Sequence, residues 1–155
     1  MWNQNKASFN AKNNTTVTGM QYKAAEGFTL AFQNGWDKEA YTNGKIWQVA
    51  TLRPGKYRLE VTYAYTMVVS DVGNFISALM AKGNSESDIP NVADIEQLNG
   101  VCAIYDKAGT NDDSGILVTP SFEVTETTDV VIGFLTSLAK GNSYFKVTEL
   151  KLILE

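Results

Sequence analysis

Aromatic side chains and short polar side chains occur together in several segments of the sequence that we expect to be loops. Trp36 is followed by Asp37, Tyr41 lies four residues further on, and Tyr105 precedes the turn that contains Asn111. Flat aromatic rings can stack on the apolar face of a sugar ring, and amides and carboxylates can hydrogen-bond its hydroxyls. The same residues have a packing interpretation, because a loop aromatic also serves to anchor its turn on the domain edge.

Trp47 stands at the start of an apolar run, which favours packing in a core or an interface over contact with a ligand.

Carboxylates offer a second kind of chemistry, the binding of calcium. Asn111, Asp112 and Asp113 are consecutive and carry side-chain oxygens, but calcium needs six to eight oxygens and this run lacks the spacing of a known calcium loop. A solvated turn capped by Asx side chains is therefore the favoured interpretation. Glu26 and Glu149 are predicted metal ligands only if the two ends of the chain adjoin, in which case they could hold a structural calcium ion. No cofactor is required.

Histidine is absent from the sequence, and with it the commonest general base and most zinc sites. An acid and base pair would have to consist of two carboxylates across a cleft, as in glycoside hydrolysis. Nothing in the sequence marks two carboxylates as facing each other, so we predict a protein that is not an enzyme. A small glycosidase or lyase remains a weaker alternative.

The composition points to one globular domain over residues 1–155, with an irregular segment at 1–18. The formal net charge is -4 and there is no run of Lys or Arg, which argues against nucleic acid as a partner. No apolar run approaches the roughly 18 residues of a membrane span, and the N-terminus lacks the apolar core of a signal peptide. Cys102 is the single cysteine and is expected to be a buried, inert thiol.

The elements that must position these residues are strands. Between residues 44 and 67 the side chains of Tyr57, Leu59, Val61, Tyr63 and Tyr65 alternate with polar ones, which predicts a strand with one buried face that includes all three tyrosines. The preceding run 46–52 is a second strand, and the Pro-Gly pair at 54–55 predicts a type II turn between them, with Gly55 at positive φ.

Similar patterns predict further strands over 28–32, 75–80, 101–105, 116–124, 130–135 and 144–154. Pro120 places its strand at an edge or a bulge, and the alternation of the last strand slips by one residue at Glu149, which predicts a β-bulge. The segment 91–98 is expected to form one short helix. About eight or nine short strands with turns between them describe an all-β protein, an antiparallel β-sandwich of jelly-roll type.

Three local patterns of this chain resemble the galactose-binding-like jelly roll found in many carbohydrate-binding modules. They are the strand at 46–52, the turn and strand at 52–59, and the closing pair that runs from 121–124 through 131–134 to 145–152. The chain is also similar to uncharacterised C-terminal domains of surface lipoproteins of gut bacteria. In the position where such relatives often carry Asp in the final strand, this chain has Glu149, so their calcium site does not transfer.

The resemblance implies a non-catalytic, weakly glycan-binding module of a secreted or cell-surface protein, present here as a domain cut from a longer chain. Other domains of that surface protein are possible partners. The alternative is a structural spacer or protein-interaction domain of a larger lipoprotein. The predicted ligand-binding residues are Trp36, Asp37, Tyr41, Trp47, Tyr105 and Asn111, and the predicted metal ligands are Glu26 and Glu149.

Overall fold

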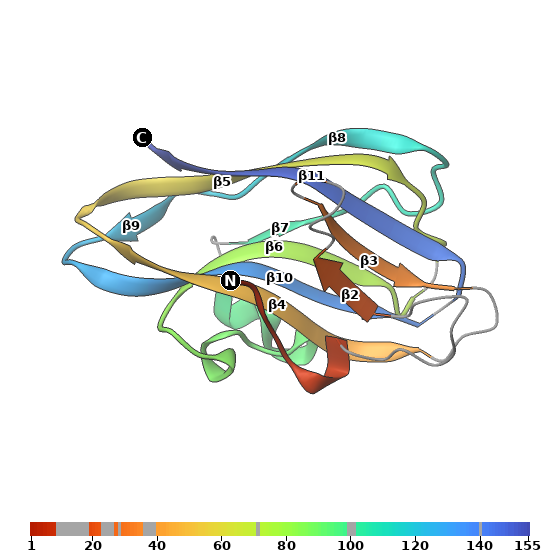
Figure 1. Cartoon of the computed structure of the whole chain (residues 1–155), viewed down its shortest axis with the longest axis horizontal. Coiled ribbons are helices and arrows are strands. Elements are labelled where there is room, and N and C mark those ends of the chain that lie inside the picture. The colour runs from red at the N-terminus through yellow and green to blue at the C-terminus, as the bar shows by residue number, and fades with distance from the viewer. Residues whose placement is uncertain are drawn as a thin grey trace.

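Two antiparallel β-sheets lie face to face in the computed structural model of the chain (Figure 1). The structure describes residues 1–8, 19–22, 27, 29–35, 40–70, 72–98, 102–139 and 141–155. The strands are β1 (Asn3–Gln4), β2 (Gly19–Tyr22), β3 (Leu30–Asn34), β4 (Tyr41–Leu52), β5 (Gly55–Thr66), β6 (Phe75–Lys82), β7 (Cys102–Ile104), β8 (Asp113–Val118), β9 (Phe122–Val124), β10 (Thr128–Leu138) and β11 (Ser143–Leu154).

Sheet A has the strand order β1-β4-β10-β6-β7, and sheet B has the order β2-β3-β11-β5-β8. Strand β9 also pairs with β5, on the stretch that β8 does not reach. Three short 3₁₀ helices complete the described part: η1 (Lys6–Ser8), η3 (Glu86–Asp88) and η4 (Val92–Leu98). The predicted all-β sandwich is confirmed, and the short helix expected at 91–98 is a 3₁₀ helix rather than an α-helix.

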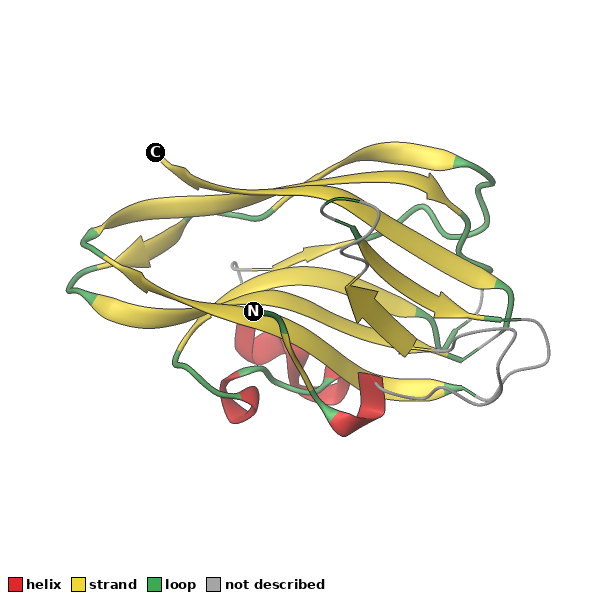
Figure 2. Ribbon diagram, viewed as in Figure 1, coloured by secondary structure: helices red, strands yellow, loops and turns green. Residues whose placement is uncertain are grey.

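Strand β10 is buried on both faces because it lies at the centre of sheet A and each face of the sheet is covered. On one face Val130, Ile132 and Phe134 pack against sheet B in the main core. On the other face Val131 and Leu135 pack beneath η4, which Figure 2 shows below the sheet. This double burial explains why the sequence of β10 is apolar without alternation.

The predicted turn joins β4 to β5, but the two strands lie in different sheets and do not form a hairpin. Gly55 does not take the positive φ expected for a type II turn. Strand β5 begins at Gly55, and the Tyr57 hydroxyl donates a hydrogen bond of 2.9 Å to the carbonyl oxygen of Arg53, which closes the turn. Tyr57, Leu59 and Val61 are buried in the main core, as the alternation predicts.

Tyr65 is not buried, and the prediction that it belongs to the core is wrong. The pairing of β5 with β8 shifts register between Tyr63 and Thr66, so that Thr66 takes the inward position and the side chain of Tyr65 is 71% exposed. Tyr65 has a φ of 54°, a left-handed conformation that is rare for a bulky residue. A bulge of this kind inverts the inside and outside positions of a strand.

Two other predicted irregularities are confirmed. The pairing of β11 with β5 shifts register between Val147 and Glu149, which is the expected bulge. Pro120 separates β8 from β9, and both segments pair with β5 at the edge of sheet B. Strand β8 begins earlier than expected, at Asp113, because its residues pair with the end of β5.

Candidate functional site

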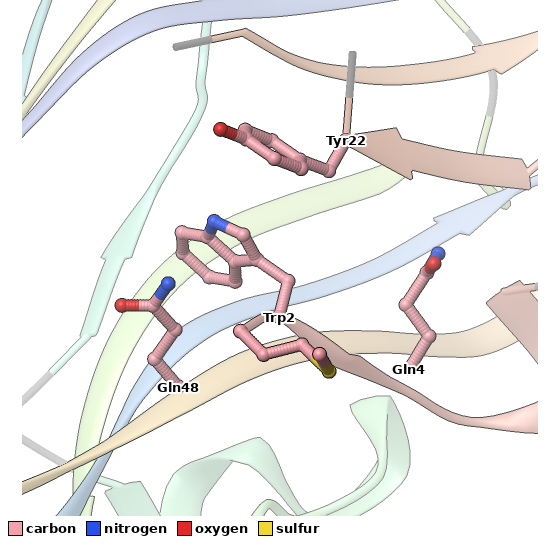
Figure 3. A pocket seen from close by; sticks show the side chains of 5 residues that line it. Trp2, Gln4, Tyr22 and Gln48 are labelled. Atoms are coloured by element: carbon pink, nitrogen blue, oxygen red, sulfur yellow. The ribbon is translucent and has the colours of Figure 1, made fainter. Parts of the chain in front are cut away.

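A hollow of about 520 Å³ lies where the edge strand of sheet A, β1, approaches the edge strand of sheet B, β2. Figure 3 shows the aromatic rings of Trp2 and Tyr22 on either side of this space, with one glutamine side chain at each end. The lining residues are Met1, Trp2, Gln4, Tyr22 and Gln48.

The glutamine of β1 ties the two sheets together at the floor of the hollow. Gln4 is paired opposite Ile46 of β4, and its Nε2 donates a hydrogen bond of 2.5 Å to the carbonyl oxygen of Met20 in β2. The indole ring of Trp2 rests on the core, with its centroid 6.5 Å from that of Phe134. Backbone pairing of β1, one hydrogen bond between the sheets and one ring contact therefore hold the part of the hollow that β1 forms.

Asn5 fixes the chain immediately after β1 and so fixes the position of Trp2. Its side chain is buried, and its Oδ1 accepts hydrogen bonds of 3.0 Å from the backbone N–H groups of Ser8 and Lys45. Its Nδ2 donates to the carbonyl oxygen of Asn43 at 2.8 Å. A two-residue strand would contribute few ladder hydrogen bonds, and these side-chain bonds stabilise it.

Gln48 and Tyr22 form the other side of the site. Gln48 is opposite Ile132, a core residue, so its side chain points into the space between the sheets. It is half-buried, and within the described residues neither atom of its amide has a hydrogen-bond partner. Tyr22 lies two residues after the buried Met20 and therefore on the same face of β2, but at the strand end its side chain is 45% exposed.

The chemistry of this lining is neutral and amphipathic. The two rings offer apolar faces, and the two amides offer a donor and two acceptor oxygens at short range. None of the five lining residues is a carboxylate, a histidine or a basic side chain. Such a surface can bind a neutral, hydroxylated ring.

A smaller hollow of about 160 Å³ lies at the end of the sandwich, beside the start of β11. Two of its polar side chains are engaged by the protein: Asn34 is buried and donates to the carbonyl oxygen of Leu138 at 3.4 Å, and the Ser143 hydroxyl accepts from the N–H of Val69 at 3.0 Å. We therefore regard the larger hollow as the better candidate site. The lining residues of the smaller one are Gln33, Asn34, Gly35, Met67, Asn142, Ser143 and Tyr144.

Several predicted site residues have a location in the structure that argues against contact with a ligand. Tyr41, Trp47 and Tyr105 are 4%, 7% and 7% exposed. The Tyr41 hydroxyl is 3.0 Å from the Thr136 hydroxyl oxygen, and burial raises the pKa of Tyr41. Trp47 packs beneath η4 on the outer face of sheet A. Since a sugar cannot reach these rings in the folded protein, burial disfavours three of the predicted ligand contacts.

Tyr105 has a structural role of its own. Its hydroxyl donates a hydrogen bond of 2.9 Å to Oδ2 of Asp113, and burial followed by this bond raises the pKa of Tyr105. Asn111 is exposed in the turn before β8 and does not line the hollow.

Of the two predicted metal ligands, Glu149 alone lies in the described part of the chain. Glu149 is half exposed, and its Oε2 lies 2.9 Å from Nζ of Lys151. The described residues contain no group of three or more His, Cys, Asp or Glu side chains that could hold a metal ion. Glu26, Trp36 and Asp37 lie outside the described residues, so their assignments stay predictions, as does a structural calcium ion.

None of the described residues among the predicted ligand contacts lines the larger hollow. Trp2 and Gln4, which do line it, lie in or beside β1, an edge strand of sheet A within the segment 1–18 that we expect to be irregular. The spacing of Trp2 and Gln4, which places both on one face of an extended chain, was the available signal. The contributions of Tyr22 and Gln48 depend on how the two sheets pack, which a one-dimensional pattern does not contain.

The fold and the hollow place the chain in the structural class of β-sandwich modules. A solved structure described as TmCBM61, a carbohydrate-binding module, in complex with beta-1,4-galactotriose matches this chain with a TM-score of 0.55. The match covers 100% of this chain and 88% of that chain, at 12% sequence identity, and it shows a shared fold.

Residues 1–133 match the model of the family described as Domain of unknown function (DUF5013), and the chain belongs to that family. A search of curated proteins finds no match. Among the described residues, no helix is both long and apolar enough to cross a membrane.

Proposed function

We propose that this protein is a non-catalytic carbohydrate-binding module that holds a neutral glycan in the hollow between β1 and β2. The observation that carries the proposal is the Gln48 amide, half-buried, without a partner in the described residues, and beside the indole ring of Trp2 (Figure 3). The amide atoms of Gln48 are accessible to solvent, and the hydroxyl groups of a ligand stacked on the aromatic rings can hydrogen-bond them.

The fold supports this proposal without naming the ligand. The structural neighbour binds a galactotriose, and its match here is one of fold. Since fold does not determine function, the argument rests on the local chemistry of the lining. The resemblance to domains of bacterial surface lipoproteins suggests a secreted or cell-surface location, which we include in the proposal.

Binding is expected to be weak. The hollow is open to solvent and offers two rings and two amides, so a dissociation constant on the order of micromolar to millimolar is appropriate, or about 4 to 8 kcal/mol. Because this binding free energy is small, each aromatic ring or amide should contribute a sizeable part of it.

The test is calorimetric titration of the protein with a panel of neutral oligosaccharides, beginning with beta-1,4-galactotriose, after screening on a glycan array. For a glycan that binds, we expect Tyr22→Ala and Gln48→Ala each to raise the dissociation constant about tenfold, which corresponds to about 1.4 kcal/mol. Tyr22 is the most informative position because its ring is partly exposed at a strand end and contributes little to the core.

Tyr65→Ala is the matched control, since this tyrosine is more exposed and lies far along sheet B on β5. Its affinity for the same glycan should equal that of the wild type. Absence of binding to every glycan on the array would overturn the proposal, and so would unchanged affinity in the Tyr22 and Gln48 variants.

A further inference from the structure

Strand β8 forms one edge of sheet B and carries apolar side chains on its outer face. Its strand partner is β5, with Ile116 opposite Thr62 and Val118 opposite Glu60. The side chains of Ile116 and Val118 are 60% and 49% exposed. Edge strands in natural proteins usually carry Lys, Pro or a bulge that prevents pairing with another chain, and residues 114–118 contain none of these.

The exposed tyrosine of β5 extends this apolar surface. Because of the bulge, Tyr65 projects on the outer side of sheet B next to Ser114, whose Oγ accepts a hydrogen bond of 3.3 Å from the Tyr65 N–H. The left-handed backbone conformation of Tyr65 is strained in a bulky residue, and such strain is concentrated at functional sites. Here it places an aromatic ring in solvent beside an unprotected strand edge.

We propose that β8 pairs with β8 of a second copy of this chain, so that two sheets B join into one continuous antiparallel sheet. Residues directly opposite each other in an antiparallel pair lie on the same face, so an outward residue must meet an outward residue. A two-fold axis through Ile116 satisfies this condition. It sets Ser114 opposite the second copy's Val118 and Gly115 opposite its Leu117.

This register is favoured over a two-fold axis through Gly115, which also matches the faces. An axis at Gly115 would set Asp113 opposite Leu117, an inward apolar residue. An axis at Ile116 leaves Asp113 beyond the paired stretch and brings Val118 of the second copy beside the ring of Tyr65. The exposed tyrosine thereby acquires an apolar contact.

The charged residues near β8 do not oppose the pairing of two copies of this strand. Asp113 is the only charged residue of the strand, and its Oδ2 accepts hydrogen bonds from the hydroxyls of Tyr63 at 3.1 Å and Tyr105 at 2.9 Å. Its carboxylate is therefore turned into the protein, and two acidic chains can meet at residues 114–118 without placing like charges opposite each other.

The interface would be small. A stable protein interface buries roughly 1,200–2,000 Å², and a pair of strands with five paired residues each buries less, so we expect a weak, concentration-dependent dimer. The proposal does not depend on glycan binding, because β8 and β2 are the opposite edges of sheet B and the hollow remains open in such a dimer.

Cysteine cross-linking tests the register. In a Cys102→Ala background, Ile116→Cys should form a disulfide-linked dimer under mild oxidation, because opposite residues on the two-fold axis have Cα atoms about 4.5–5.5 Å apart and a disulfide tolerates about 4.4–6.8 Å. We expect cross-linking at least tenfold faster than for Val72→Cys, a control position that is fully exposed in a turn.

Two further variants distinguish this register from random collision. Ser114→Cys alone should not cross-link, whereas a mixture of Ser114→Cys and Val118→Cys should.

Sedimentation of the wild type at rising concentration should show a dimer. Ile116→Lys should remove this dimer and retain the circular dichroism spectrum of a folded protein. Cross-linking of Ile116→Cys no faster than the control, or a wild type that stays monomeric up to millimolar concentration, would overturn the proposal.

Discussion

At the scale of single residues, the carboxylate of Asp113 is held by several contacts at the edge of the core. Two tyrosine hydroxyls donate to the same oxygen, Oδ2, and Nζ of Lys107 lies 3.9 Å from Oδ1. The ring of Tyr63 packs edge-on against that of Tyr105, with centroids 5.4 Å apart. The pair of tyrosines thus joins β5 to the loop before β8, and both hydroxyls must remain protonated to donate.

This arrangement predicts a loss of stability in alkaline solution. Burial, then the hydrogen bond to Asp113 and the charge of that carboxylate, raise the pKa of Tyr63 to about 12 from its ordinary value of about 10. Since the folded-state pKa is the higher one, the stabilisation is complete below pH 10 and is lost as the pH rises from about 10 through about 12. The free energy of urea unfolding, measured from pH 8 to pH 12, should fall across this window.

Absorbance of tyrosinate provides the control for that assignment. The wild type should contain tyrosines that titrate late, and Tyr63→Phe should remove one of them. Asp113→Asn should shift the late titration to lower pH, because the negative charge that disfavours tyrosinate is gone. An alkaline loss of stability that is unchanged in Tyr63→Phe would contradict the role given to this residue.

At the scale of elements, β10 packs closely on the backbone of β4. A Cβ atom at Gly133 would collide with the carbonyl oxygen of Ile46 and would lie 2.8 Å from Cα of Trp47. These are backbone atoms of the neighbouring strand, so they cannot move aside without separating the two strands. Gly133→Ala should therefore destabilise the protein by about 3 kcal/mol or more, the upper end of the usual range for overpacking.

Gly55→Ala is the matched control, because its added Cβ would meet the tip of Leu154, a flexible side chain on an outer part of β11, at 2.8 Å. We expect its midpoint of thermal unfolding to fall by a few degrees at most, whereas Gly133→Ala should unfold many degrees lower or fail to accumulate in soluble form. Equal midpoints for the two variants would show that the β4–β10 contact is less rigid than the structure indicates.

The elements also show how far the sequence could determine the fold. Strands β4, β5, β10 and β11 were predictable because alternation, turn residues and burial act within ten or twelve residues of each other. Tyr65 was placed wrongly because a bulge opposite β8 shifts the inside and outside positions, and the bulge depends on a partner strand some fifty residues away in the sequence. Side chains that alternate regularly along the sequence can therefore lie on the opposite face of the sheet from the one predicted.

The candidate site was less predictable than the fold, for the same physical reason. Its lining comes from residues 1, 2, 4, 22 and 48, which meet only when the edges of the two sheets approach each other. Tyr41, Trp47 and Tyr105, three of the predicted ligand contacts, fill the two cores instead. The sequence contains many aromatic and amide side chains, but the packing of the two sheets determines which of them reach solvent.

At the scale of the whole molecule, the two proposed surfaces occupy opposite edges of the sandwich. The glycan hollow lies by β1 and β2, whereas β8 bounds the far edge of sheet B, as Figure 1 shows. Sites separated in this way and sharing no contacts usually contribute independently. A dimer formed through β8 would present two hollows that can engage one polymeric glycan together, and linked sites of this kind gain avidity without new contacts.

This independence can be measured with one variant and two forms of the same ligand, and the measurement rests on both proposals. Ile116→Lys should bind a short soluble oligosaccharide with the wild-type dissociation constant, within about twofold, because the hollow is untouched. Its retention on the corresponding immobilised polysaccharide should fall about tenfold or more, since the bivalent contact is lost. Thr62→Lys, a substitution on the neighbouring strand that leaves β8 itself unchanged, serves as the charge-matched control. A weaker affinity of Ile116→Lys for the soluble oligosaccharide would show instead that the two edges of the sandwich are coupled.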